Sequence, residues 1–218
     1  MTKANVNGPH QGLPVLHGGA PFQLAKAAMI LLHGRYASAE DILRLGDGIG
    51  RKDVLYLAPQ AADHEWLPHT FREPAERQEP KLTSALAVVG GLVNALGEVG
   101  FPPEKIVLSG FSQGACLATH FAATHPRRYG GVMAFSGALI GDPVRAGDFS
   151  GSLEGTPVFM GCGDADDLIP LDRVHGTSEI LRGLGAEVTE RIYPGMGHTV
   201  SDDELGEARR LLSLLTEA

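Results

Sequence analysis

The stretch Lys105-Ile-Val-Leu-Ser-Gly-Phe-Ser-Gln-Gly-Ala-Cys-Leu-Ala-Thr-His120 joins an apolar run, a serine between glycines and a run of small residues. Ile106–Leu108 predicts a short β-strand. The run from Ala115 predicts a helix that ends before Pro126, because the residue preceding a proline disfavours helical backbone. The chain turns from strand to helix within a few residues.

The turn itself has the pattern G-x-S-x-G, with Gly110 and Gly114 on either side of Ser112. Bulky side chains at the two glycine positions would collide with neighbouring backbone in so tight a turn. Such a turn exposes the Ser112 hydroxyl and leaves the amide of Gln113 unpaired at the start of a helix. The pattern alone is weak in a chain with 29 glycines, where a glycine-rich turn with a surface serine is the alternative. The flanking strand and helix therefore carry the prediction of a nucleophilic serine.

The composition of the whole chain narrows the classes of function. A length of 218 residues suits one domain with a full-sized core, so we expect a single domain over residues 1–218. The formal charge of −8 argues against a nucleic-acid partner, and no apolar run is long enough to span a membrane. The first ten residues lack the apolar core of a signal peptide. Cys116 and Cys162 predict two reduced, buried thiols, and we expect a cytoplasmic protein.

Apolar runs and helical patterns alternate along the rest of the chain. Residues 1–13 predict a poorly ordered tail, and residues 60–80 predict a long loop of the kind that is often functional. Buried strands are expected at Ala27–Leu32, Asp53–Ala58, Gly131–Ser136 and Pro157–Gly161, with an edge strand at Glu187–Tyr193 and a weak strand at Pro14–His17. Helices are expected at residues 38–48, 82–99, 171–184 and 202–215. This alternation predicts an α/β fold with a mostly parallel sheet and helices on both faces.

A nucleophilic serine needs a base, and the base must lie at the same sheet edge as Ser112. In α/β-hydrolases the order along the chain is serine, acid, then histidine. His120 and His125 fall on the helix after Ser112 and point away from that edge, and His175 falls inside a predicted helix. Only His198 follows a strand within a glycine-rich loop. We therefore expect His198 to be the base.

The acid that orients the histidine should come from the loop after strand Pro157–Gly161. That loop contains Asp164, Asp166 and Asp167, and the spacing alone does not choose among them. The nearby histidine and thiol are not at a recognisable metal-ligand spacing, so we expect no metal here. A serine, histidine and carboxylate need no cofactor, and we expect none.

Four motifs in order resemble those of the phospholipase/carboxylesterase group of α/β-hydrolases, which includes the acyl-protein thioesterases. They are Leu32-His-Gly34, Gly110-Phe-Ser-Gln-Gly114, Gly163-Asp-Ala-Asp-Asp-Leu-Ile-Pro170 and Gly197-His198. The resemblance extends from about Ala27 to the C-terminus. It implies that the acid is Asp166, four residues before Pro170. It also implies that the amides of Arg35 and Gln113 form the oxyanion hole.

The resemblance also implies that Ile169 and the loop around Trp66 line the acyl side of the cleft, and Phe71 belongs to that loop. Tyr36 stands where the group often has glycine, so either the loop turns differently or Tyr36 accepts backbone strain. Its ring then either borders the cleft or packs on the surface. No insertion is long enough for a large lid.

The predicted function is a serine carboxylesterase acting on small soluble esters or thioesters through an acyl-enzyme on Ser112. We expect a small-molecule ester as partner, with no nucleic acid, no membrane span and, as one option, a homodimer. The alternatives are a non-catalytic binding module with the same fold, or the same triad acting on other acyl or C–C bonds.

Overall fold

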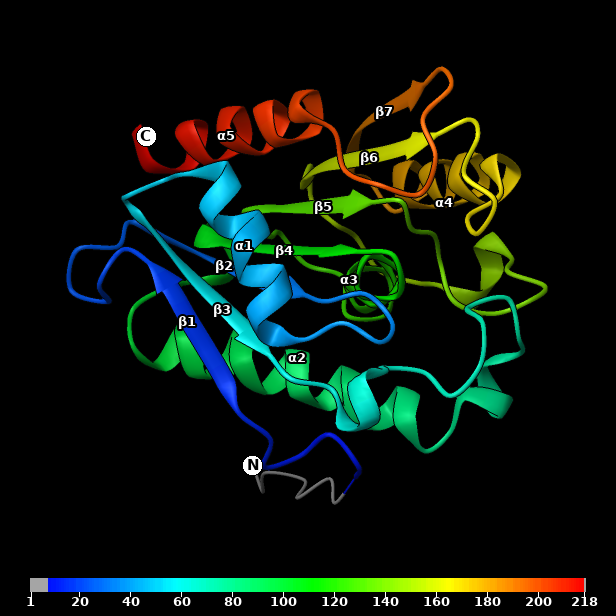
Figure 1. The fold of residues 1–218 in the computed structure, drawn as a ribbon, viewed down its shortest axis with the longest axis horizontal. Helices are drawn as coiled ribbons and strands as arrows, with labels where there is room; N and C mark the ends of the chain where they lie inside the picture. The colour runs from blue at the N-terminus through cyan, green and yellow to red at the C-terminus, as the bar shows by residue number, and fades with distance from the viewer. Residues whose placement is uncertain (1–7, 218) are drawn as a thin grey trace.

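The structure, a computed structural model, describes residues 8–217. Its centre is a seven-stranded sheet with the order β1-β3-β2-β4-β5-β6-β7, in which β1 alone runs antiparallel to its neighbour (Figure 1). The strands are β1 (Val15–Gly19), β2 (Ala27–Leu32), β3 (Val54–Pro59), β4 (Ile106–Phe111), β5 (Gly131–Phe135), β6 (Pro157–Gly163) and β7 (Glu187–Tyr193). The predicted mostly parallel sheet is confirmed, with the segment Glu187–Tyr193 at its edge.

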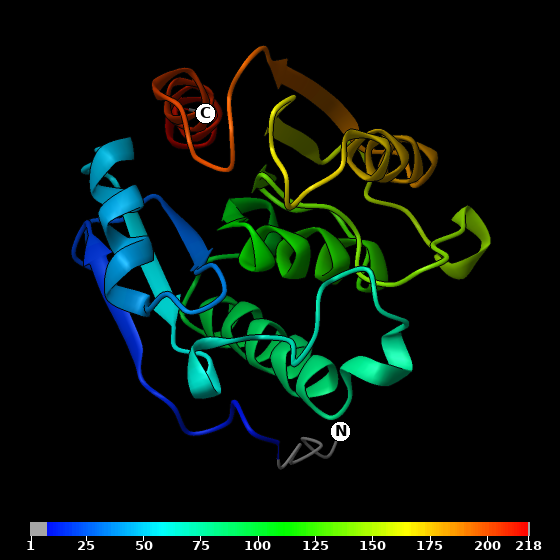
Figure 2. The ribbon, with the colours of Figure 1, turned by 45° about the vertical axis from the view of Figure 1, so that its right-hand side comes forward.

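Helices cover both faces of the sheet, as predicted. The two faces are visible in Figure 2, with α1 (Ala39–Ile49) and α5 (Asp202–Glu217) on one and α2 (Lys81–Glu98), α3 (Gln113–Thr124) and α4 (Leu171–Gly183) on the other. Alternate residues of β2 point to opposite faces: Ile30 packs in the core beneath α2 and α3, and Leu31 packs in the core beneath α1 and α5. Because both faces are covered, β2 is apolar throughout and all six of its residues are buried.

The α1 helix begins where its sequence predicts. The Ser38 hydroxyl accepts a hydrogen bond from the Asp41 amide, and the Asp41 carboxylate accepts one from the Ser38 amide. This capping box pairs amides that would otherwise lack partners at the start of the helix. Left-handed Gly50 then ends the helix.

The N-terminal segment differs from the expectation of a poorly ordered tail over residues 1–13. Residues 1–7 lie outside the described part of the chain, but the rest of this segment is packed on the domain. His10 is buried, with Nε2 3.2 Å from the Trp66 carbonyl oxygen, and its amide donates to Ser84 Oγ. The prediction of poor order is wrong for residues 8–13. The polar composition of the segment does not reveal that His10 contacts Trp66 and Ser84, 56 and 74 residues further along the chain.

The carboxyl ends of the parallel strands meet at one edge of the sheet, and the loops that follow β2, β4, β6 and β7 carry the candidate site. Two longer connections, residues 60–80 and 136–156, contain the short 3-10 turns η1 (Ala62–His64), η2 (Ala75–Gln78) and η4 (Ala146–Asp148), and a further turn, η3 (Pro103–Lys105), precedes β4. Neither connection forms a helical lid within residues 8–217. Across that same range, no helix is both long and apolar enough to cross a membrane.

Candidate active site

Ser112 lies in the turn between β4 and α3, with φ 56° and ψ −123°. This left-handed φ is uncommon for a residue with a side chain and stores strain in the turn. A Cβ on Gly110 would lie 2.4 Å from the Gly114 carbonyl carbon, and one on Gly114 would lie 2.0 Å from the Leu32 carbonyl oxygen. The two glycines are therefore required by close backbone approach, as the sequence predicts.

Three side chains from separate loops meet at this turn. Ser112 Oγ lies 2.8 Å from His198 Nε2, and His198 Nδ1 lies 2.7 Å from Asp166 Oδ2. Ser112 follows β4, Asp166 follows β6 and His198 follows β7. The Asp166 side chain is fully buried, and the His198 side chain is 16% exposed. A base that is oriented by a buried carboxylate and hydrogen-bonded to a hydroxyl is suited to activating a serine.

The Asp166 carboxylate is held in its ionised form. Burial by itself raises its pKa, but the hydrogen bond to His198 and those from the amides of Leu168 and Ile169 outweigh burial, so the pKa lies below its ordinary value. Cys162 lies beside it, with Sγ 3.7 Å from Asp166 Oδ2. Burial, and secondly this carboxylate, raise the pKa of the Cys162 thiol to about 12, so it stays neutral.

The other candidates from the sequence lie elsewhere. Asp164 accepts a hydrogen bond from the Gly195 amide at 2.6 Å, and Asp167 is exposed. His120 is buried in α3, where burial and then His125 lower its pKa to about 4. His175 pairs with Glu190 on the surface. No group of three or more His, Cys, Asp or Glu side chains within residues 8–217 could hold a metal ion.

The two amides expected to form the oxyanion hole belong to residues that are clamped by the loop 61–68. Gln113 Oε1 accepts from the Trp66 amide at 2.6 Å, and Gln113 Nε2 donates to the Leu67 carbonyl at 3.0 Å. Arg35 donates to Glu65 Oε2 at 2.8 Å and to the Pro68 carbonyl. Within residues 8–217, the amide N–H groups of Arg35 and Gln113 donate to no acceptor. Both therefore remain available to a ligand.

The charge of Glu65 links this clamp to α2. Glu65 Oε1 accepts from Lys81 Nζ at 2.9 Å, so one carboxylate joins Lys81 to Arg35. Burial raises the pKa of Glu65, but the hydrogen bonds from Lys81 and Arg35 outweigh burial and lower it. The carboxylate thus remains charged between the two cations.

Three residues that were expected to line the acyl side of the cleft are buried. Trp66 is fully buried, with its indole N–H donating to the His33 carbonyl, while Phe71 is 7% and Ile169 3% exposed. Trp66 therefore supports the loop from below, and the prediction that it lines the cleft is wrong. A tryptophan in an aperiodic loop suggests exposure, but here the indole fills the space between His33 and His10, with ring centroids 5.1 Å and 5.4 Å away.

Tyr36 has a left-handed backbone with φ 64°, which is the strained conformation among the two that the sequence allows. Its amide donates to the His64 carbonyl at 2.7 Å, which holds the turn. The ring is 75% exposed, with the Arg35 guanidinium 5.1 Å from its centroid. Tyr36 thus projects into solvent and takes no part in the cavity described below.

Two features near the site were absent from the sequence-based prediction. Phe111, the residue before Ser112, lies against His198 with ring centroids 4.7 Å apart and the rings tilted by 36°. Ser201 and Glu204 form a capping box at the start of α5, three residues after His198, with Glu204 Oε2 accepting from the Ser201 amide at 2.6 Å. The Ser-x-x-Glu spacing is a readable signal for that helix start.

The chain is similar to known proteins over most of its length. The family model described as phospholipase/carboxylesterase matches residues 20–216. Acyl-protein thioesterase 1 of Gibberella zeae is 36% identical over 118 residues, which cover 52% of this chain and 49% of that protein. A probable carboxylesterase of Oryza sativa subsp. japonica is 32% identical over 147 residues, 67% of this chain and 54% of that protein. The aligned part of the chain thus spans about half the length of these curated relatives.

A solved structure extends the similarity to nearly the full length. The crystal structure of a phospholipase/carboxylesterase from Dyadobacter fermentans has a TM-score of 0.87 and 38% sequence identity, and the match covers 92% of this chain and 96% of that one. The sheet and helices therefore form an α/β-hydrolase fold. Taken with the family model, this places the chain in the phospholipase/carboxylesterase family.

Proposed function

We propose that this protein is a serine hydrolase that cleaves small soluble carboxylic esters or thioesters through an acyl-enzyme on Ser112. One observation carries the proposal: the hydrogen-bonded chain from Ser112 Oγ through His198 to Asp166, with separations of 2.8 Å and 2.7 Å. Relatives named as thioesterases and carboxylesterases support the same class of reaction.

In the first half-reaction, His198 Nε2 takes the proton of Ser112 Oγ as Oγ attacks the substrate carbonyl carbon. The carbonyl π electrons move to oxygen. When the tetrahedral intermediate collapses, the bond to the leaving oxygen or sulfur breaks, and His198 gives that atom the proton. Asp166 accepts from His198 Nδ1–H and stabilises the imidazolium while it exists.

In the second half-reaction, water takes the place of the alcohol or thiol. His198 removes a proton from water as the water oxygen attacks the acyl carbon. When this tetrahedral intermediate collapses, the bond between the acyl carbon and Ser112 Oγ breaks and His198 gives the proton to Oγ. The products are a carboxylic acid and free enzyme, and no redox change occurs.

The amides of Arg35 and Gln113 hold the negative oxygen of both tetrahedral intermediates. The Gln113 amide is at the N-terminus of α3, where the helix favours negative charge. Losing one such donor costs about 2.7–4 kcal/mol of barrier. The clamp from loop 61–68 supports this role, because fixed donors need no reorganisation during the reaction.

A cytoplasmic location belongs to the same proposal. Its support is chemical: Cys116 and Cys162 are both free and buried, as in reducing compartments.

Labelling with a fluorophosphonate probe tests the proposal. The wild-type protein should be labelled at Ser112 and should hydrolyse p-nitrophenyl acetate, while a folded Ser112→Ala variant should do neither. A folded wild-type protein that is not labelled and cleaves no ester or thioester would contradict the proposal and favour a non-catalytic binding module. Comparing oxygen esters with their matched thioesters then gives the preferred leaving atom.

A further inference from the structure

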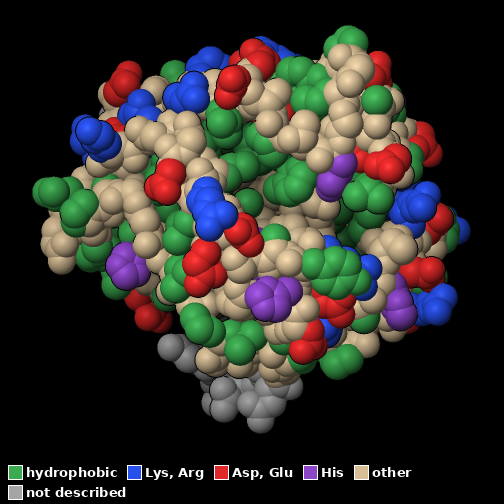
Figure 3. Space-filling view, in the orientation of Figure 1, with side chains coloured by type: hydrophobic (Ala, Val, Ile, Leu, Met, Phe, Trp, Pro, Cys, Tyr) green, Lys and Arg blue, Asp and Glu red, His purple; other side chains and the backbone are tan. Residues whose placement is uncertain are grey.

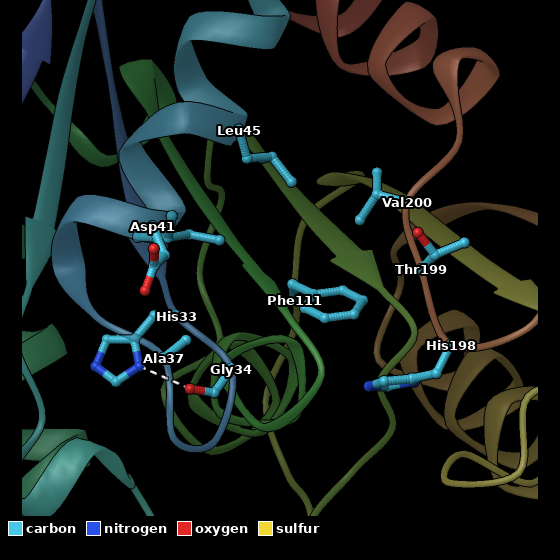
Figure 4. Close-up of a pocket in the computed structure, with 10 residues that line it drawn as sticks. His33, Gly34, Ala37, Asp41, Leu45, Phe111, His198, Thr199 and Val200 are labelled. Carbon is cyan, nitrogen blue, oxygen red and sulfur yellow. Dashed lines mark hydrogen bonds between the residues drawn. The ribbon is translucent and has the colours of Figure 1, made fainter.

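A cavity of about 330 Å³ lies beside the catalytic groups, between α1 and the segment that follows His198. Its volume is at the lower end of the range of ligand pockets, about 300–1,000 Å³. Most of the wall is apolar and comes from Ala37, Ile42, Leu45, Phe111 and Val200, while His33, Asp41, His198 and Thr199 add polar side chains (Figure 4). In Figure 3, hydrophobic side chains gather around a hollow in the middle of the same face. The reaction as proposed gives this cavity no role.

Some residues that line the cavity also touch the reacting centre. His198 lines the cavity, and the Phe111 ring is tilted against the His198 ring with centroids 4.7 Å apart. Gly34 also lines it, and a Cβ on Gly34 would lie 3.4 Å from Ser112 Cβ. A substrate bonded to Ser112 Oγ can therefore extend directly into this space.

The required proton transfer decides which part of the substrate enters. The tetrahedral carbon carries an oxyanion, an acyl substituent and a leaving oxygen. The oxyanion faces the amides of Arg35 and Gln113, and the leaving oxygen must lie at His198 Nε2 to receive its proton. A group attached to that oxygen then continues past His198, along Thr199 and Val200, into the cavity.

The side chains expected on the acyl side of Ser112 are buried. Trp66 and Leu67 are fully buried, and Ile169 is 3% exposed. These three side chains therefore offer an acyl group almost no exposed apolar surface. The acyl substituent is accordingly the smaller of the two groups.

We propose that the cavity between α1 and residues 198–200 is a subsite for the leaving alcohol, and that it selects esters of a small acid with a compact apolar alcohol. This inference rests on the proposed esterase function. Leu45 and Val200 form opposite walls of the subsite and set its size. One methylene in an apolar pocket changes kcat/KM by about 10–200-fold.

Two isomeric esters provide the test. Benzyl acetate carries its phenyl ring on the alcohol, and methyl phenylacetate carries it on the acid, so they differ only in the side that must accept the ring. After division by the alkaline hydrolysis rate of each ester, kcat/KM should favour benzyl acetate by about tenfold or more. A ratio near one or in favour of methyl phenylacetate would overturn the assignment.

Variants locate the effect within the molecule. Leu45→Trp and Val200→Phe fill the subsite from opposite walls, and each should lower the ratio of benzyl acetate to methyl phenylacetate by about tenfold. Leu45→Ala enlarges the subsite and should raise kcat/KM for acetates of bulkier alcohols relative to kcat/KM for benzyl acetate. Leu43→Ala is the matched control, because Leu43 is in the same helix and core but lies near Gly18, outside the cavity. It should leave the ratio unchanged.

Failure of the inference and failure of the esterase function are distinguishable. If the fluorophosphonate probe labels each folded variant and both esters are cleaved, but filling leaves the ratio unchanged, the subsite alone is wrong. If Leu45→Trp and Val200→Phe lower kcat/KM only for methyl phenylacetate, the cavity binds the acyl group, and the inference is also overturned. If folded wild-type protein is not labelled and cleaves neither ester, both proposals fall together.

Discussion

The two sides of Ser112 differ in what their side chains contact. On one side, the loop 61–68 is fastened to the oxyanion residues: Gln113 bonds to Trp66 and Leu67, and Arg35 bonds to Glu65 and Pro68. On the other side, α1 and residues 199–200 line a cavity of about 330 Å³, and most of their side chains there are apolar. One side is closed by polar contacts, and the other is open and apolar.

This difference follows from the separate demands of binding and catalysis. Donors that stabilise an oxyanion must be fixed before the charge develops, and the hydrogen bonds to loop 61–68 provide that rigidity. A leaving group must enter and depart, so its side needs apolar surface without fixed contacts. Both sides share the catalytic centre, so variants at the centre and on each side test this separation.

The largest effect should come from the shared centre. Ser112→Ala and His198→Ala should each lower kcat on any accepted ester by about 10⁴-fold or more, and the double variant should be little worse, because the two side chains act as a unit. Steady-state kinetics with benzyl acetate and methyl phenylacetate measures this. Losses that multiply in the double variant would show that the two residues act independently.

Asp166→Asn should lower kcat by about 10⁴-fold, because an amide favours the wrong imidazole tautomer. Asp164→Asn and Asp167→Asn are matched controls from the same loop. Both should keep most activity, because neither side chain contacts His198. Activity assays on the three folded variants decide the assignment, and a collapse for Asp164→Asn with survival of Asp166→Asn would move the role to Asp164.

A smaller effect is expected from the closed side. Gln113→Ala keeps the backbone amide but removes the bonds to Trp66 and Leu67, so the oxyanion donor loses its support. We expect kcat to fall by about 10–100-fold with little change in KM, less than the 10²–10³-fold typical when one donor is lost. The fall should be equal for the two isomeric esters, since the alcohol side is untouched.

Gln78→Ala is the control for that experiment. Gln78 is also a buried amide, and it donates to the Thr70 carbonyl, away from the oxyanion residues. It should destabilise the fold without lowering kcat. An equal fall in kcat for both variants would mean that general loosening, and not support of the amide, explains the loss.

Acidification should weaken the fold partly through Asp166. Its folded pKa lies below the ordinary value of 3.8, so its contribution to stability is present above that value and is lost as the pH falls through the folded pKa. Asp166→Asn lacks this contribution at every pH. Urea unfolding should be measured between about pH 6 and pH 3, a window that includes the titration of ordinary carboxyl groups. The free energy of unfolding should fall less with acidification for the variant than for the wild type. Equal losses would contradict the role of Asp166 in stability.

The smallest effects should come from Tyr36, which lies on neither side. Tyr36→Phe should leave kcat/KM for both isomeric esters unchanged, because the ring is exposed and lines no part of the cavity. Tyr36→Gly relieves a left-handed φ and should change the free energy of unfolding by no more than about 1 kcal/mol, since the entropic cost of glycine offsets the relief. Thermal denaturation and the ester ratio measure both expectations, and altered selectivity would return Tyr36 to the site.

Much of the fold could be predicted from local patterns. The bounds Ala27–Leu32 and Glu187–Tyr193 agree with β2 and β7, because continuous and alternating apolar residues depend only on burial of one or both faces. The start of α1 was equally readable from Ser38 and Asp41. Close backbone approach at Gly110 and Gly114 follows from the tightness of the turn.

The choice of acid shows where local information ends. Spacing left Asp164, Asp166 and Asp167 open, and the family resemblance chose Asp166. The structure brings Asp166 to 2.7 Å from His198 and turns Asp164 to the Gly195 amide. These side chains are two residues apart but point to different partners, which depends on how the loop after β6 meets the loop after β7.

The sequence by itself determined the alternation of strands and helices and the tight turn at Ser112, because both depend on neighbours a few residues away. Only the tertiary structure decided that Trp66 is buried, that His10 packs beside it and that Leu45 faces Phe111 and Val200. Trp66 is fixed by contacts with His33, 33 residues away, and Gln113, 47 residues away. Such contacts leave no periodic pattern, because the side of a loop that faces solvent is set by the element that packs against it.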